Sequence, residues 1–348
     1  MAERVRLYLR VPGTDPMPEL MSLIQRIEAA GFDGAGILDS QLLSRDTFIV
    51  LAQAAAHTRT LTLFPAVSNP FTRHPSVLAG AIQTVEEMAP GRVKFAFGTG
   101  YTSASTIGRK PATLAEMRAC IEQMRALLQG READWNGKPG RLAFASKRPI
   151  PLIMAATGPR AIELAGEIAD GVLLMVGFNK GIIDAALSCL ERGAQKGGRK
   201  LDDLEIIWGV RTGIGATTAA ARRQARPIAV HWGVMEPNQW LAAAGLNLPR
   251  YDIPEATRQI YPDLMHARNW EEAIAATSFV DNGVLAQLCD ALGLFGTPED
   301  CAKRIVAVTQ LGVRSMYLLP SRTFGAPEEE IAAFRDVVIP YLAKAGLR

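Results

Sequence analysis

The chain has 348 residues, of which 48% are hydrophobic, and a formal net charge of +3. This composition predicts a folded globular protein with a large core, and so mild a charge gives no indication of a nucleic-acid partner. No stretch reaches the roughly eighteen uninterrupted apolar residues that a membrane span requires, and the charged N-terminus lacks the apolar region of a secretory signal, so no membrane partner is expected.

The predicted elements alternate between short β-rich segments and amphipathic helices almost to the end of the chain. Strands are predicted at 5–9, 34–38, 61–64, 93–97, 151–155, 171–176, 204–210 and 315–319. Helices are predicted at 18–30, 47–57, 76–88, 114–128, 160–169 and 180–196. Eight right-handed strand–helix units close naturally into a (β/α)8 barrel, so we predict a single barrel domain over 1–348. An open doubly wound sheet is the alternative, but the strand order gives no sign of reversing.

Two segments interrupt the alternation. Residues 134–144 carry an Asn-Gly turn between β-forming residues and predict a small hairpin. Residues 234–296 form a long insertion between strands seven and eight, and long insertions in compact domains are often functional. This insertion is expected to be either a lid over the active site or an extra helical layer outside the barrel.

The cysteine and histidine spacings argue against a metal site. None of the four cysteines forms a CxxC pair, and none of the four histidines forms an HxH or HExxH pair. The cysteines are Cys120, Cys189, Cys289 and Cys301, and the histidines are His57, His74, His231 and His266. We expect reduced, buried thiols, which predicts a cytoplasmic location.

In a barrel, ligands meet the residues just beyond the carboxyl ends of the strands. These positions are 10–13, 39–40, 66–69, 98–101, 156–160, 177, 211–212 and 320–322. The segment Thr157-Gly158-Pro159-Arg160 opens a helix, so its amides either hold an anion such as phosphate or form an ordinary cap. Asp39 either accepts hydrogen bonds from a ligand or caps the next segment, and Arg73-His74 has either a ligand or a structural hydrogen-bonding role.

Two long segments carry a resemblance to a known family. VSNPFTRHPSVLAGAIQTVEEMAPGRVKFAFGTG, from Val67 to Gly100, resembles the corresponding region of the luciferase-like superfamily, most of all its methylenetetrahydromethanopterin reductase branch. TGPRAIELAGEIADGVLLMVG, from Thr157 to Gly177, is similar to that family's phosphate-side loop, helix and sixth strand, and GFDGAGILDS falls in the expected order before both. The resemblance implies a (β/α)8 barrel that binds flavin mononucleotide (FMN) or its deazaflavin analogue, coenzyme F420.

The resemblance also implies a cofactor site. The ring would rest against Ala66, Val67 and Ser68, with a non-prolyl cis peptide bond between Ala66 and Val67. Asp39 would lie at the pyrimidine edge of the ring, with Asn69 nearby. The other implied cofactor-binding residues are Gly98, Thr99 and Gly100 along the ring and Thr157, Gly158, Pro159 and Gly177 at the phosphate.

This sequence departs from the reductase branch at two acidic positions. Tyr101 stands directly after the second glycine of the GxG turn, and Arg10 stands near the end of strand one. Tyrosine can donate a proton, but its ordinary pKa near 10 makes it a weak acid at neutral pH. We therefore expect another reaction than that of methylenetetrahydromethanopterin reductase, with Tyr101 and His74 as the candidate catalytic residues.

The resulting functional hypothesis is hydride transfer between reduced F420 and a small organic substrate. One alternative is an FMN-dependent monooxygenase that uses oxygen and a separate flavin reductase; another is a non-catalytic flavin-binding paralogue. A third alternative, a nicotinamide dehydrogenase, is supported only by the motif Gly213-Ile214-Gly215, in which Thr218 stands in place of the third glycine. Related barrels commonly pair as homodimers, so we expect one here.

Overall fold

The computed structural model describes residues 4–236 and 238–348, and the chain divides into two compact units. The first unit comprises Tyr8–Leu174 and Ser188–Ile207. The second unit comprises Met1–Leu7, Met175–Leu187 and Trp208–Arg348. Strands β1 (Arg6–Val11) and β9 (Glu205–Ile214) each continue from one unit into the other.

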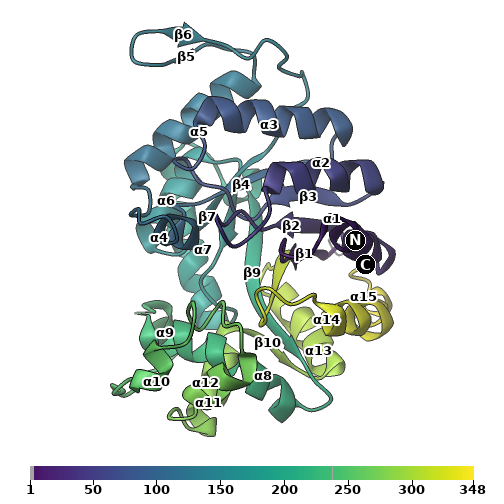
Figure 1. Cartoon of the computed structure of the whole chain (residues 1–348), viewed down its shortest axis with the longest axis vertical. Helices are drawn as coiled ribbons and strands as arrows, with labels where there is room; N and C mark the ends of the chain where they lie inside the picture. Colours follow the sequence, from purple (N-terminus) through teal and green to yellow (C-terminus); the bar gives the residue numbers. More distant parts are fainter. Residues whose placement is uncertain (1–3, 237) are drawn as a thin grey trace. The chain divides into compact units, whose positions relative to one another are not determined.

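The first unit is built from parallel strands with helices between them (Figure 1). Its strands after β1 are β2 (Gly34–Ile37), β3 (Thr62–Pro65), β4 (Phe95–Phe97), β7 (Leu152–Ala156) and β8 (Gly171–Leu174). Its helices are α1 (Met17–Ala29), α2 (Thr47–His57), α3 (Pro75–Met88), α4 (Tyr101–Ser105), α5 (Leu114–Leu128), α6 (Pro159–Ile168) and the end of α7 (Lys180–Lys196), with the 3-10 turn η1 (Leu201–Asp203). Because parallel strands are covered on both faces, their residues form nearly continuous buried runs.

The second unit contains the end of β9, β10 (Gly293–Gly296) and β11 (Ser315–Pro320). Its helical elements are α8 (Thr218–Val230), the π-helix η2 (His231–Met235), α9 (Trp240–Ala243), α10 (Glu255–Arg258), α11 (Trp270–Ala276), α12 (Asn282–Leu292), α13 (Pro298–Thr309), α14 (Glu328–Ala333), the π-helix η3 (Phe334–Val338) and α15 (Ile339–Lys344). Strand β10 pairs with β9 in parallel, with Gly293 opposite Arg211. Strand β10 was not predicted from the sequence, because these four residues fall inside the predicted insertion.

The strands form one parallel sheet in the order β3-β2-β1-β11-β9-β8-β7-β4, with β10 added to β9. A bridge between Leu63 and Val93 brings β3 beside β4, so the two ends of the order meet. The result is a nearly closed eight-stranded barrel with helices between the strands, which confirms the predicted (β/α)8 fold. All eight predicted strands are present, and α2, α5 and α7 have the predicted bounds.

The predicted hairpin is also confirmed. Strands β5 (Ala133–Asp134) and β6 (Pro139–Gly140) pair antiparallel. The turn between them places Asn136 and Gly137 at φ 56° and 84°, the positive values that a two-residue hairpin turn requires. In Figure 1 this hairpin projects beyond helices α3 and α5.

The insertion predicted at 234–296 contains α9 to α12 and β10. It has apolar clusters of its own, one formed by Ile260, Leu264 and Ala273 with Met235 packed against it. Helix α12 also packs on α8. The predicted role of the insertion as a lid over the active site stays a prediction.

Polar side chains meet at the amino-terminal ends of the strands of the first unit. Lys94 forms an ion pair with Glu205 and lies 5.2 Å from the centre of the Tyr8 ring. This ion pair lies away from the carboxyl ends of the strands, where ligands bind in such barrels, so we assign it to stability. Among residues 4–236 and 238–348, no helix combines the length and apolarity needed to cross a membrane.

Candidate functional site

The carboxyl ends of β2, β3, β4 and β7 belong to the first unit and lie along one edge, because the strands are parallel. The residues beyond these strand ends are Asp39, 66–69, 98–101 and 157–160. The structure therefore brings together the predicted cofactor-binding residues of four strands.

The segment after β3 forms the predicted bulge. The peptide bond between Ala66 and Val67 is cis, which confirms the expectation from sequence. Neighbouring strands hold this segment on both sides: the Ala66 amide donates to the Ile37 carbonyl at 2.6 Å, and the Ser68 amide donates to the Ala96 carbonyl at 3.1 Å. The Gly98 amide in turn donates to the Ser68 carbonyl at 2.9 Å. Ser68 is thus fixed between the ends of β2 and β4.

Asp39 is the centre of a buried hydrogen-bond network. Its side chain is 3% exposed, and its Oδ2 accepts from Ser68 Oγ at 2.7 Å and from Arg73 Nη1 at 2.8 Å. Its Oδ1 accepts from Arg73 Nη1 at 3.0 Å and from Gln41 Nε2 at 3.2 Å. An ionised carboxylate accepts about four hydrogen bonds. The chain itself therefore occupies the acceptor positions of Asp39.

Arg73 joins two carboxylates from different loops. Its Nη2 donates to Asp46 Oδ2 at 2.8 Å, and its guanidinium lies 5.1 Å from the centre of the Phe48 ring. Burial by itself lowers the pKa of Arg73, but the charge of Asp39 and the hydrogen bonds to Asp46 and Asp39 outweigh it and raise that pKa. Burial likewise opposes ionisation of Asp46, yet the Arg73 bond lowers its pKa. Arg73 thus has the structural role that the sequence analysis left open.

Asn69 organises the next turn. It is fully buried, its Oδ1 accepts from the amides of Phe71 and Thr72 at 3.3 and 2.9 Å, and its Nδ2 donates to Ser103 Oγ at 3.1 Å. Asn69 was predicted to bind cofactor, and the structure shows its amide engaged within the protein. Its contribution to a ligand site is to shape the turn.

The glycine turn after β4 is closely packed. A side chain at Gly98 would meet Val67 Cγ2 at 3.3 Å and Ala155 Cβ at 3.4 Å. Gly100 has φ 80°, and a Cβ there would lie 2.8 Å from Phe71 Cζ. Thr99 lies between them and accepts from the Ala112 amide at 2.8 Å through its carbonyl. A Cβ at either glycine would press against neighbouring side chains, most severely at Gly100, where φ is positive and Phe71 is the neighbour.

Helix α6 begins beyond β7 with an open N-terminus. Gly158 is its N-cap, Pro159 its first residue, and no side chain caps it. Thr157 and Arg160 are exposed beside this helix start. Uncapped amides at a helix N-terminus favour an anion, so this segment has the chemistry to hold a phosphate group.

The two predicted catalytic residues, Tyr101 and His74, and the predicted phosphate-binding residue Gly177 have three different environments. Tyr101 is the first residue of α4 and is 49% exposed. His74 caps α3, with Nδ1 accepting from the Ser76 amide at 3.3 Å, and its ring lies 4.6 Å from that of Trp135. Gly177 belongs to the second unit, where a Cβ would lie 2.7 Å from Ile182 Cδ1. His74 thus has the environment of a helix cap, and Gly177 has that of a closely packed position.

Sequence analysis missed Gln41. Its Nε2 bonds Asp39, while its Oε1 is buried and has no hydrogen-bond partner among the residues that the structure describes. A buried acceptor of this kind calls for a donor. The ring N–H of a flavin or deazaflavin is one such donor, so Gln41, the glycine turn and the open end of α6 fit such a cofactor. Only the position of Gln41 two residues after Asp39 could have indicated it.

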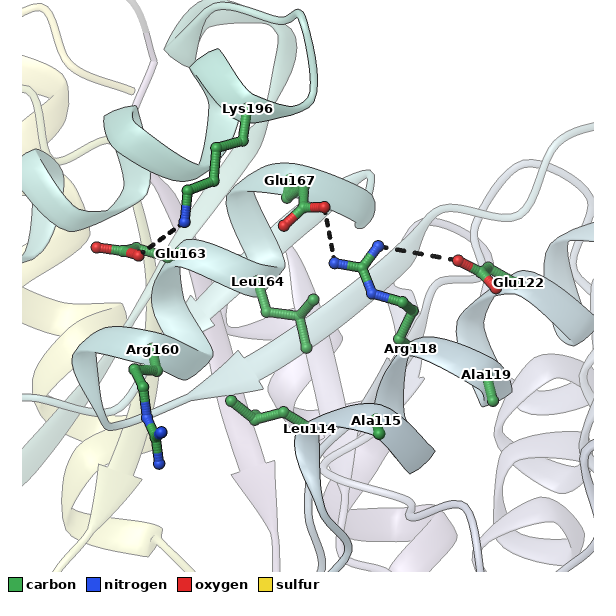
Figure 2. A pocket seen from close by; sticks show the side chains of 10 residues that line it. All are labelled: Leu114, Ala115, Arg118, Ala119, Glu122, Arg160, Glu163, Leu164, Glu167 and Lys196. Carbon is green, nitrogen blue, oxygen red and sulfur yellow. Dashed lines mark hydrogen bonds and ion pairs between the residues drawn. The ribbon is translucent and has the colours of Figure 1, made fainter.

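A groove on the outside of the first unit runs along α5, α6 and α7 and has a volume of about 460 Å³ (Figure 2). Arg118 bonds Glu167 at 2.7 Å across it, and Lys196 lies 3.3 Å from Glu163. Figure 2 shows Arg160 turned away from these pairs. Because these ion pairs link exposed or half-buried side chains on neighbouring helices, we interpret the groove as a solvated helix surface.

Within 4–236 and 238–348, no group of three His, Cys, Asp or Glu side chains is arranged to hold a metal ion. All four cysteines are free and buried, and burial raises the pKa of Cys120, Cys289 and Cys301 to about 12. These thiols are therefore unreactive at neutral pH.

The barrel with a bulge after β3 and a glycine turn after β4 defines a class of (β/α)8 proteins that bind ligands at the strand ends. The luciferase-like monooxygenase family matches residues 4–315, and the chain belongs to this family. The family contains oxidoreductases, and the relatives of this chain include F420-dependent reductases and dehydrogenases.

Three relatives illustrate the similarity. The chain is 27% identical to 5,10-methylenetetrahydromethanopterin reductase of Archaeoglobus fulgidus over 304 residues, which is 85% of this chain and 87% of that protein. It is 30% identical to the F420-dependent glucose-6-phosphate dehydrogenase of Nakamurella multipartita over 54% of this chain and 61% of that protein. The structure of the coenzyme F420-dependent tetrahydromethanopterin reductase of Methanopyrus kandleri superposes with a TM-score of 0.78 at 24% identity, covering 97% of this chain and 99% of that one.

Proposed function

We propose that this protein is an F420-dependent oxidoreductase that transfers hydride between the deazaflavin and a small organic substrate. The observation that carries the proposal is the match to methylenetetrahydromethanopterin reductase along 85% of the chain. Deazaflavin, when bound, supplies the hydride chemistry, and the protein's contribution is to bind, orient and shield.

The proposal assigns the ring and the phosphate of this cofactor to residues of the first unit. The bulge at Ala66, Val67 and Ser68 would support the ring, and Gln41 Oε1 would accept a hydrogen bond from the ring edge. Asp39 would act through Ser68 and Arg73, which it holds in place, because its own acceptor positions are filled. Gly158 and Pro159 would hold the phosphate at the start of α6, with Thr157 beside them.

The proton donor is proposed to be Tyr101, because it is exposed at the end of the glycine turn. His74 is retained as a catalytic candidate only on its position in the sequence, since the contacts described for it are those of a cap. An FMN-dependent monooxygenase is the second candidate, favoured by the tyrosine at position 101 where the reductase branch carries an acid.

The test is fluorescence titration of the purified protein with F420 and with FMN, each in oxidised and reduced form. Preference for F420 supports the proposal, and preference for reduced FMN, with oxygen-dependent product formation, replaces it by the second candidate. Binding of neither cofactor favours a non-catalytic paralogue.

A variant of α6 tests the phosphate site within the same titration. Gly158→Asp places a carboxylate at the N-cap, where it stabilises the helix and competes with a phosphate for the same amides. We expect cofactor affinity to fall at least tenfold while the melting temperature does not fall. An unchanged affinity would exclude the start of α6 as the phosphate site.

The partners are proposed on the same basis. A homodimer and a separate reductase that supplies reduced cofactor are both consistent with the proposed chemistry, and the buried, free cysteines are consistent with a reducing cytoplasm. Sedimentation of the purified protein at several concentrations tests the dimer.

A further inference from the structure

The second unit contains a buried histidine whose ring nitrogen lacks a partner. His231 begins the π-helix η2 directly after α8 and is 7% exposed. Its Nε2 is buried and has no hydrogen-bond partner in the part of the chain that the structure describes. Buried polar atoms in native proteins are nearly always hydrogen-bonded, and isolated π-helical turns occur frequently at functional sites. The neighbourhood of His231 therefore has the features of a ligand site.

Charged and aromatic side chains surround this histidine. The Trp232 ring meets the His231 ring edge-on at 5.0 Å, and the Arg211 guanidinium lies 5.1 Å from the centre of the Trp232 ring. His266 approaches from the insertion, with Nδ1 2.8 Å from Asp263 Oδ2. Arg211, Asp263 and His266 are the titratable groups whose charges act on His231.

These residues come from ligand-binding positions of the barrel. Arg211 lies near the carboxyl end of β9, and Phe324, whose ring packs 5.2 Å from His266, follows β11. His231, Asp263 and His266 belong to η2 and the insertion that follow β9. All of them are in the second unit, so their arrangement does not depend on the first.

The electrostatics favour a negatively charged ligand. Burial above all, and then the charge of Arg211, lowers the pKa of His231 to about 4, so its imidazole is neutral near pH 7. A neutral imidazole carries one N–H donor, and an arginine beside it attracts anions. Asp263 opposes this attraction, and its carboxylate accepts hydrogen bonds from the amides of Met265 and His266 and lies 2.8 Å from His266 Nδ1.

We propose that His231 Nε2 and Arg211 form a binding site for an anionic oxygen group, namely a carboxylate or phosphate of the substrate. That the anion belongs to a substrate rests on the proposed function, whereas the anion site itself does not. The neutral imidazole donates one hydrogen bond to the oxygen and Arg211 supplies the charge.

Histidine-selective NMR of the full-length, cofactor-free protein tests the site, with acetate as the probe at constant ionic strength. We expect the Cε1–H signal of His231, identified by its loss in His231→Gln, to shift and saturate. The signal of His57, which is exposed and bonds the Gln53 carbonyl, is the control and should not respond. In Arg211→Gln the acetate affinity should fall at least tenfold.

A His231 signal that moves no more than that of His57 would overturn the proposal, as would an unchanged affinity in Arg211→Gln. If His231→Gln does not fold, the signal is assigned by elimination from variants of the other three histidines. The titration of the wild-type protein then still decides the question.

Two further titrations distinguish a substrate anion from a free anion and test the anion site independently of the proposed function. If the anion is part of a substrate, lactate, a carboxylate with an adjacent alcohol, should bind more tightly than acetate once oxidised F420 is bound. Equal binding of acetate, phosphate and lactate would assign the site to a free anion. The anion site would then be retained, and its role in binding the substrate would be excluded. If F420 fails to bind but acetate shifts the His231 signal, the proposed function is wrong and the anion site is retained. If F420 binds but acetate does not shift the His231 signal, the anion site is excluded.

Discussion

At the scale of single residues, Asp39 and Arg73 illustrate how a ligand-like motif becomes a structural one. A buried carboxylate must be paired, and here one arginine pairs it while also reaching Asp46 at the start of α2. Together they join the loops after β2 and β3, so they would act on the proposed cofactor site through the positions of Ser68 and Gln41. This role predicts a loss of folding stability as well as of affinity.

Replacement of Arg73 by Met should destabilise the protein by about 3 kcal/mol, because it leaves a buried charge on Asp39 without its partner. Urea denaturation measures this change. Arg192→Met removes an arginine from an exposed pair with Glu163 and should have little effect. Equal effects of the two variants would show that the buried position of Asp39 is unimportant.

A pair of glycine variants isolates the packing of the glycine turn. Gly100 and Gly108 both have positive φ, 80° and 68°, but a Cβ at Gly108 meets nothing within 4 Å, whereas one at Gly100 meets Phe71. Alanine at Gly108 should cost about 1 kcal/mol through the backbone alone, and alanine at Gly100 about 2–3 kcal/mol. Cofactor affinity should fall only for Gly100→Ala, and a loss in both variants would contradict a site at this turn.

At the scale of elements, the helices of the site region differ at their N-termini. Asp46 caps α2 through two amides and His74 caps α3, whereas α4 and α6 have no side-chain cap. Helix α4 has five residues and begins at Tyr101, the proposed proton donor, and α6 is the helix proposed to hold a phosphate. The starts of α2 and α3 are satisfied from within the chain.

The cap at α3 predicts how His74 variants behave. His74→Ala should destabilise the protein by about 1 kcal/mol, and His74→Asn, which restores an N-cap acceptor, should recover most of that loss. Thermal denaturation of the two variants gives the comparison. If His74→Asn is stable yet loses turnover at least a hundredfold, His74 is catalytic and the capping role is incidental.

At the scale of the whole molecule, the buried His231 links folding stability to pH. Its pKa is about 4 in the folded protein against an ordinary value of 6.5, so the unfolded chain binds the proton more readily. The contribution of His231 to stability is therefore full above pH 6.5 and is lost as the pH falls from 6.5 towards 4.

The expected loss is on the order of 3 kcal/mol by pH 4. The measurement is the free energy of unfolding of the wild type and of His231→Gln between pH 7.5 and 4.5, where the wild type should show the steeper decline. His57→Gln is the matched control and should follow the wild type. Parallel curves for the wild type and His231→Gln would contradict the neutral, buried imidazole.

The amino-acid sequence by itself determined the alternation of eight strands with helices, the hairpin at 134–144 and the polar residues at the strand ends. These features depend on local periodicity and turn residues, which can be read from neighbours in the chain. The cis bond at Ala66-Val67 was expected from the family resemblance and is confirmed.

Only the tertiary structure decided which polar groups are already engaged. The partners of Asp39 come from positions 41, 68 and 73, and the charges that act on His231 come from positions 211, 263 and 266, so sequence separation hides them. Strand β10 was missed for a related reason, because Gly293–Gly296 becomes a strand only through pairing with β9. A polar residue at a strand end can serve a ligand or the protein, and the difference depends on which donors and acceptors the fold brings within hydrogen-bonding distance.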